Sequence, residues 1–129
     1  MANGHRTQIK RERNAQKDTR PSAKLSYARI PVQKACFVMD AIRGKDVEAA
    51  MGILTYNNRY ASEVILKLLN SAVANAENNL GMDRESLYVA ETFANEGPTL
   101  KRYWARSHGR ADQILKRTSH ITVILDQVK

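Results

Sequence analysis

The sequence contains little of what secreted, membrane-spanning or disulfide-bonded proteins need. Among its 129 residues Cys36 is the single cysteine, so no internal disulfide can form and a reducing compartment is indicated. No run of about 18 apolar residues is present, which argues against a membrane-spanning helix. The first twenty residues are polar, so we expect no secretory signal sequence.

Groupings of residues that support catalysis are also scarce. The three histidines are His5, His108 and His120, and none has Cys or Asp residues at a spacing that would assemble a metal site. Ser107 and His108 are neighbours, but no carboxylate is placed to orient the histidine as a catalytic triad requires. The stretch EGPTLKR lacks the second glycine and the Lys-Ser/Thr pair of a phosphate-binding loop. The sequence therefore predicts no enzyme, no cofactor and no bound metal.

Positive charge is abundant and is concentrated at the two ends of the chain. Lys and Arg number 21 against 13 Asp and Glu, which gives a net charge of +8. Residues 1–22 carry six cations and two anions, residues 101–129 carry seven and two, and residues 23–100 carry eight and nine. A nearly neutral body with basic ends indicates a polyanionic partner, and nucleic acid before a membrane.

Residues 1–22 form a basic extension in which Ile9 is the only large aliphatic residue after Met1. Because so little apolar surface can be buried, folding of this segment alone would not offset its loss of chain entropy. We therefore expect the extension to be flexible until a partner is bound. An organelle-targeting peptide is the alternative, but Glu12 and Asp18 interrupt the acid-poor composition of such peptides.

Residues 23–129 are expected to form a single domain that contains both strands and helices. KLSYARI alternates like a strand over residues 24–30, with Leu25, Tyr27 and Arg29 on one face. Three helices follow, from Pro31 to a C-cap at Gly44, from a cap at Asp46 to Leu54, and over about 60–79. Their apolar stripes are Ala35, Val38, Met39 and Ile42; Val47, Ala50, Met51 and Leu54; and Ala61, Val64, Ile65, Leu68, Leu69, Ala72, Val73 and Ala76.

The apolar period changes after Gly81. LYVAETFANEG at residues 87–97 and HITVIL at 120–125 indicate strands, the latter with Ile121, Val123 and Leu125 on one face. The interval between them favours one long hairpin over about residues 86–127 that turns near 105–109. A strand over 87–100 spans roughly 45 Å, against a radius of gyration of about 13 Å for such a domain. The predicted fold is α+β, with three helices packed on a small antiparallel sheet from which a long β-hairpin projects.

The tip of this hairpin, about residues 101–110, is rich in cations and aromatic rings. Lys and Arg side chains contact phosphates, and flat rings stack on unpaired bases. A solvated hairpin with a chance run of charge is one alternative, and a free-standing regulator that uses the β-ribbon on DNA is another. The predicted phosphate contacts are Lys101, Arg102, Arg106, Arg110, Lys116 and Arg117, and the predicted stacking residues are Tyr103, Trp104 and His108.

Three further cations, Lys34, Arg43 and Lys45, flank the first predicted helix. On the residues alone they are as consistent with an ordinary solvated face as with a binding surface. RNA binding by these three side chains therefore needs support from elsewhere in the sequence.

The segment EGPTLKRYWARSHGRADQILKRTSHITVIL, residues 96–125, closely resembles the hairpin signature of the bacterial L-twenty-two family of large-subunit ribosomal proteins. RGK at residues 43–45, preceded by Lys34 and Ala35, and SAVANAENN at 71–79 match in the same order. The resemblance covers roughly residues 24–128. It implies a small body docked on ribosomal RNA through Lys34, Arg43 and Lys45, with a hairpin that runs into the subunit.

The resemblance also implies a destination and partners for the hairpin tip. Tyr103, Trp104, Ala105 and His108 would face the exit tunnel of the nascent polypeptide. The implied partners are large-subunit ribosomal RNA, neighbouring ribosomal proteins and the nascent chain, with one copy of the protein per ribosome. A structural role in the cytoplasmic ribosome and in the assembly of its large subunit follows as the expected function.

Overall fold

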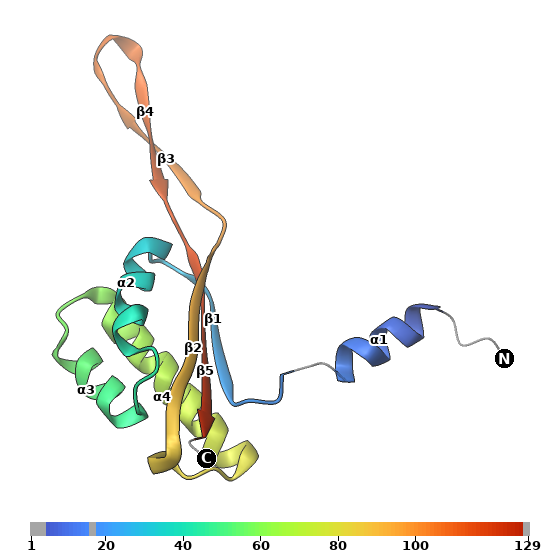
Figure 1. Ribbon diagram of the computed structural model, residues 1–129. Helices are drawn as coiled ribbons and strands as arrows, with labels where there is room; N and C mark the ends of the chain where they lie inside the picture. Colours follow the sequence, from blue (N-terminus) through green and yellow to red (C-terminus); the bar gives the residue numbers. More distant parts are fainter. Residues whose placement is uncertain (1–4, 16–17, 128–129) are drawn as a thin grey trace.

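The computed structural model describes residues 5–15 and 18–127 of the chain. A three-stranded antiparallel sheet lies against helices, and a narrow two-stranded ribbon extends away from one end of it (Figure 1). The sheet has the order β1–β5–β2 and the ribbon pairs β3 with β4. The strands are β1 (Ser22–Ala28), β2 (Leu87–Glu96), β3 (Leu100–Ala105), β4 (Ala111–Lys116) and β5 (Ser119–Gln127). The predicted α+β fold with a projecting β-hairpin is confirmed.

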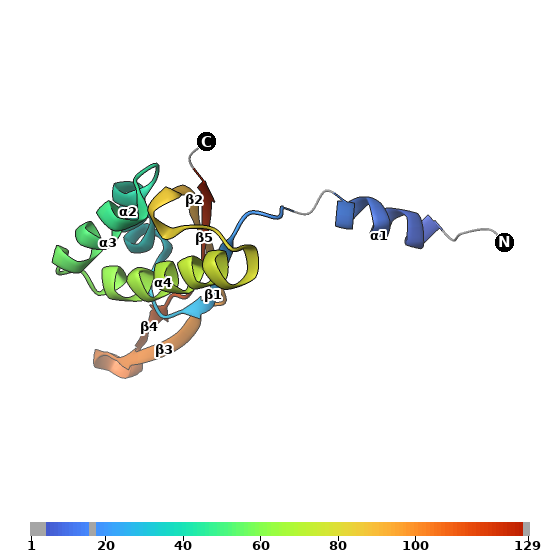
Figure 2. The same cartoon turned by 90° about the horizontal axis from the view of Figure 1, so that it is seen from below.

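The described residues contain four α-helices, one more than the sequence predicted. The additional helix, α1, begins at His5 and ends at Ala15, inside the extension that was expected to lack structure. Its Arg, Gln, Lys and Glu residues favour a helix locally. From Thr7 to Ala15 every residue except Ile9 is exposed, and α1 lies to one side of the body (Figures 1 and 2). The predicted flexibility of residues 1–22 stays a prediction.

The three predicted helices all form and cover one face of the sheet (Figures 1 and 2). The core lies between them and β5, whose Ile121, Val123 and Leu125 share one face, as predicted, and are fully buried. Met51 and Val64, expected in the apolar stripes, are only partly buried and pack against this core. These helices are α2 (Val32–Ile42), α3 (Val47–Tyr56) and α4 (Tyr60–Leu80), and a 3-10 turn, η1 (Arg84–Ser86), follows α4.

β1 does not keep the alternation that its sequence predicted. Its pairing with β5 shifts register between Leu25 and Ala28, and Tyr27 has a φ of 58°. A bulge of this kind inserts one residue and moves the following side chains to the other face. Ala28 and Ile30 are therefore buried, whereas Tyr27 and Arg29 are exposed. The prediction that Leu25, Tyr27 and Arg29 share one face is wrong.

The loop between α2 and α3 pairs with the outer edge of β2. The amide of Gly44 donates to the carbonyl of Val89 at 2.8 Å, and the amide of Val89 donates to the carbonyl of Lys45 at 2.9 Å. Gly44 has a φ of 74°, which suits glycine. Asp46 occupies the N-cap position of α3, but its side chain makes no capping hydrogen bond. The loop covers part of a strand edge that would otherwise be open to further pairing.

A small cluster of charges joins the residues before β1 to β2. The guanidinium of Arg20 donates to Asp18 at 2.6 Å and to Oε1 of Glu91 at 2.9 Å. Hydrogen bonds from the side chain and the backbone amide of Arg20 lower the pKa of Asp18 from 3.8 to about 2. The hydrogen bonds to Asp18 and Glu91 in turn raise the pKa of Arg20. The Asp18 carboxylate is thus held ionised by its neighbour.

The hairpin leaves the body where two backbone segments approach closely. The amide of Gly97 donates to the carbonyl of Thr118 at 2.9 Å, and the Thr118 hydroxyl donates to the carbonyl of Pro98 at 2.6 Å. A Cβ atom added at Gly97 would lie 2.5 Å from Oγ1 of Thr118. Thr118 is only 5% exposed, so its side chain has little space to move away. This crossing therefore requires glycine at position 97.

We predict that Gly97→Ala lowers the free energy of unfolding by about 1–3 kcal/mol, because the new methyl group overlaps the Thr118 side chain. Gly52→Ala in α3 is the matched control, since nothing lies within 4 Å of its Cβ position. Alanine in this helix should raise stability by roughly 0.5–1 kcal/mol. Urea denaturation followed by circular dichroism measures both changes. Equal stability of the Gly97→Ala variant and the wild type would contradict a tight crossing.

We predict that Asp18 titrates well below an ordinary aspartate and that Arg20→Ala returns its pKa toward 3.8. Because folding lowers this pKa, the ion pair is complete above about pH 4 and is lost as the pH falls toward about 2. An NMR titration of the Asp18 carboxyl carbon measures the effect. Arg43→Ala, which removes a cation from the far edge of β2, serves as the control and should leave the titration unchanged.

Candidate nucleic-acid interface

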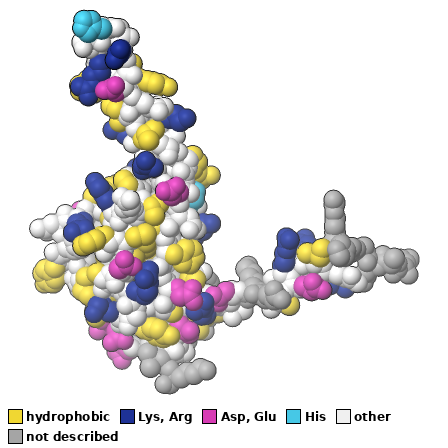
Figure 3. Space-filling view, turned by 45° about the horizontal axis from the view of Figure 1, so that its top comes forward, with side chains coloured by type: hydrophobic (Ala, Val, Ile, Leu, Met, Phe, Trp, Pro, Cys, Tyr) yellow, Lys and Arg dark blue, Asp and Glu magenta, His cyan; other side chains and the backbone are white. Residues whose placement is uncertain are grey.

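The ribbon formed by β3 and β4 is exposed along its length. Every residue from Lys101 to Gln113 is exposed, including Tyr103 at 71% and Trp104 at 61%. Figure 3 shows Lys and Arg side chains along the ribbon and a histidine at its far end. Large aromatic side chains at such positions add nothing to the core, so they are available to a partner.

Antiparallel pairing divides the ribbon residues between two faces. Residues opposite each other share a face and successive residues alternate. In the observed register Arg102 opposes Ile114 and Trp104 opposes Asp112, whereas Tyr103 opposes Gln113. Because they are successive residues of one strand, Tyr103 and Trp104 point to opposite sides of the ribbon. Of the three predicted stacking residues, Tyr103 and Trp104 thus cannot lie against the same surface.

The turn at the tip is held by its two arginines. The amide of Arg106 donates to the carbonyl of Arg110 at 2.8 Å, around the 3-10 turn η2 (Ser107–Gly109). His108 and Gly109 have φ values of 57° and 69°, in the left-handed region. Nε of Arg106 donates to Oδ2 of Asp112 at 2.6 Å, in a pair that is about 60% exposed on both sides. Arg106 thus already has an acidic partner within the protein.

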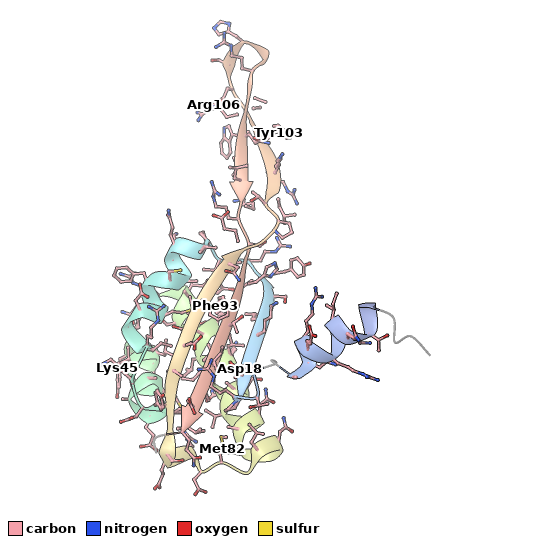
Figure 4. All side chains as sticks on the ribbon, turned by 45° about the vertical axis from the view of Figure 1, so that its right-hand side comes forward. Asp18, Lys45, Met82, Phe93, Tyr103 and Arg106 are labelled. Carbon is pink, nitrogen blue, oxygen red and sulfur yellow. The ribbon has the colours of Figure 1, made fainter. Side chains whose placement is uncertain are left out.

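The three cations predicted to anchor the body do not form one cluster. Lys34 lies in the first turn of α2, whereas Arg43 follows its last turn, about 14 Å further along the helix axis. Arg43 donates to the carbonyl of Thr92 at 2.8 Å and pairs with Asp40 at 3.0 Å. Figure 4 places Lys45 low on the body, far from Tyr103 and Arg106 on the ribbon. RNA contacts by Arg43 and Lys45 stay a prediction.

A basic hollow of about 430 Å³ lies where the ribbon meets the body. Arg102, Lys116 and Arg117 come from the ribbon and its base, and Arg29 comes from the segment after β1. Pro31, Leu100 and Leu115 complete the wall, which contains no acidic residue. We call these seven residues the basic hollow. It brings together side chains that the sequence placed about 70 to 90 positions apart.

Arg29 is the cation of the basic hollow that the sequence did not indicate as an RNA contact. The strand pattern placed it on a face with Leu25, and the β1 bulge instead turns it outward. A bulge leaves little signal in a single sequence. The only indication is that Arg29 and Lys34 flank Pro31 closely on a chain segment that is otherwise apolar or neutral.

The described residues contain neither a candidate metal site nor a candidate membrane-spanning helix. Within residues 5–15 and 18–127, no group of three or more His, Cys, Asp or Glu side chains is placed to hold a metal ion. No helix in the same ranges is both long and apolar enough to cross a membrane. Exposed cations and rings on a projecting ribbon, joined to the body by a basic hollow, are the features of a nucleic-acid-binding protein.

Comparison with known proteins identifies the family. Residues 23–126 match the family described as ribosomal protein L22p/L17e. A large ribosomal subunit protein uL22 of Lachnoclostridium phytofermentans is 68% identical over 98% of this chain and 99% of its own length. Proteins with the same description from Lachnospira eligens and Agathobacter rectalis are 68% and 65% identical, over 98% of this chain and 99% of their own lengths.

The chain belongs to the ribosomal protein L22p/L17e family. The resemblance inferred from residues 96–125 is thereby confirmed. Members of this family are structural proteins of the ribosome and not enzymes, so the prediction that the chain has no catalytic role is also confirmed.

We predict that Asp112→Ala strengthens binding to a polyanion, because it removes the acid that pairs with Arg106. The variant should elute from a heparin column at higher salt than the wild type. Asp83→Ala, which removes the same charge next to η1, is the control and should shift elution less. Equal shifts for the two variants would mean that net charge alone, and not the ribbon, controls the interaction.

Proposed function

We propose that this chain is a structural constituent of the large ribosomal subunit that binds ribosomal RNA through its ribbon and basic hollow. The observation that carries this proposal is the exposed arm of cations and rings on a body whose central sequence is nearly neutral. Membership of the ribosomal protein family and the large-subunit descriptions of its relatives support it. The protein accordingly acts in the cytoplasm, within the ribosome.

The low intrinsic stability and the positive charge of the ribbon support the proposal that RNA surrounds it. A two-stranded ribbon with few buried apolar side chains is marginally stable in water. Lys101, Arg102, Arg110, Lys116 and Arg117 would neutralise phosphates on both of its sides and release condensed counterions. RNA packed around the ribbon would thus stabilise the arm, while the arm joins RNA segments that approach the body and the tip. This arrangement suits a protein that aids subunit assembly.

The tip is proposed to reach the exit tunnel of the nascent polypeptide. β3 and β4 contain six residues each, so the ribbon adds about 20 Å beyond the sheet. Because Tyr103 and Trp104 point to opposite sides, one ring would stack on the RNA wall and the other would face the lumen. Ala105 and His108 lie at the end of the arm, next to the space that a nascent chain would occupy. One copy per ribosome, beside neighbouring ribosomal proteins, completes the proposal.

We predict that Lys116→Ala/Arg117→Ala flattens the salt dependence of binding to large-subunit ribosomal RNA. Removal of one phosphate-binding cation should reduce the log–log salt slope by about 0.7–0.9, so removal of two should reduce it by roughly 1.4–1.8. Filter binding at several salt concentrations measures the slope. Lys67→Ala/Arg84→Ala removes the same charge from α4 and η1 and should leave the slope close to that of the wild type.

Two results would contradict the proposal. An unchanged slope in the Lys116→Ala/Arg117→Ala variant would remove the ribbon base from the RNA interface. Tighter binding to duplex DNA than to ribosomal RNA at the same salt concentration would favour a free-standing regulator, the alternative that uses a β-ribbon on DNA.

A further inference from the structure

A second hollow, of about 460 Å³, adjoins the basic hollow and shares Arg29 and Pro31 with it. It lies where the segment after β1 meets the start of α4. Ile30, Pro31 and Ala61 contribute apolar surface, and Lys34, Arg59 and Tyr60 contribute polar groups. We call it the Tyr60 hollow. Its volume falls in the range of pockets that hold small ligands in proteins.

Arg59, which lines the Tyr60 hollow, lies over the ring of Phe37, a residue outside that lining. The guanidinium carbon of Arg59 lies 3.9 Å from the centroid of the Phe37 ring. A guanidinium held flat on a ring keeps its charge and its second planar face, so it can stack again. Phe37 is 61% exposed and Tyr60 is 65% exposed, so neither ring adds to the core. The exposed ring of Tyr60, beside an arginine that lies over a second ring, points to a flat ligand.

The charge of the Tyr60 hollow points to an anionic ligand. Arg29, Lys34 and Arg59 line it, and no acidic residue does. In the described part of the chain none of the three takes part in an ion pair. The ligand that fits is therefore both flat and anionic. An acidic peptide would use the cations but would leave the flat faces of Arg59 and Tyr60 without partners.

We propose that the Tyr60 hollow is a subsite for one unpaired nucleotide of RNA. The base stacks on Arg59 and Tyr60, and the flanking phosphates contact Arg29 and Lys34. The strand then continues past Pro31 into the basic hollow, where Lys116 and Arg117 receive further phosphates. This inference rests on the proposed function and adds a base-dependent contact on the body, separate from the phosphate and stacking contacts of the ribbon.

Fluorescence anisotropy with the full chain and two labelled probes tests the subsite. One probe is hexauridylate, and the other is a hexamer with the same ribose-phosphate backbone but no bases. The wild type should bind hexauridylate about fivefold or more tightly than the abasic hexamer, because base stacking strengthens binding by at least that factor. Tyr60→Ala should reduce this difference about fivefold or more, while any stacking on Tyr103 or Trp104 of the ribbon remains, and should leave the affinity for the abasic hexamer unchanged.

Two control variants separate stacking from other effects. Tyr60→Phe keeps the ring and should bind like the wild type. Tyr56→Ala removes a ring that is 89% exposed at the end of α3, outside both hollows, and should also bind like the wild type. Circular dichroism confirms that each variant is folded, as expected for substitutions of exposed side chains.

Several outcomes would overturn the subsite. These are equal affinity of the wild type for the two hexamers, equal weakening of binding by Tyr60→Ala and Tyr56→Ala, and binding of a glutamate hexapeptide as tight as that of hexauridylate. The last result would assign the hollow to an acidic peptide. The proposed function fails separately, because its test is the salt slope of the Lys116→Ala/Arg117→Ala variant on ribosomal RNA. Absence of the base effect, with the slope reduced as expected in that variant, would refute the subsite alone.

Discussion

The close crossing of Gly97 and Thr118 determines how the two parts of the molecule are joined. On one side of it, β2 and β5 pair within a sheet whose inner face is buried by helices. On the other side, the same two chain segments continue as β3 and β4 with almost no buried surface. The amide of Gly97 and the hydroxyl of Thr118 join the segments at that point. The folded body thereby holds the base of an arm that has too little apolar surface to fold alone.

The bulge in β1 is a second local irregularity, and it shapes the surface beside this crossing. The bulge at Tyr27 keeps Ala28 and Ile30 in the core and turns Arg29 outward. Arg29 then lines both hollows, between the base of the ribbon and the start of α4. The edge contact of the Tyr27 and His120 rings, at 4.7 Å, and the hydrogen bond from the Tyr27 amide to His120 Nδ1 support the left-handed backbone there. One inserted residue in a strand thus connects the basic body surface with the basic arm.

The Lys and Arg residues have two different roles: some make hydrogen bonds within the body, and others are exposed and available to phosphates. Arg20 and Arg43 make hydrogen bonds with the body, where they join the segment before β1 and the end of α2 to β2. Lys116 and Arg117, in contrast, are exposed at the base of the ribbon. Because cations of the first kind already have protein partners, less of their charge is available to phosphates. The proposed RNA interface therefore follows the ribbon and the two hollows, and the edge of β2 contributes less to it.

The local spacing of apolar residues was enough to predict the apolar stripes of α2, α3 and α4, the shared face of Ile121, Val123 and Leu125 in β5, and a basic hairpin without a core of its own. The family was also predicted correctly from residues 96–125, because a long set of motifs in a fixed order is specific for one family. α1 was missed because local helix propensity acted without an apolar face. The β1 bulge and the meeting of Arg29 and Tyr60 with distant cations became evident only in the folded chain. Those features depend on pairing register and on packing between remote segments, neither of which local spacing encodes.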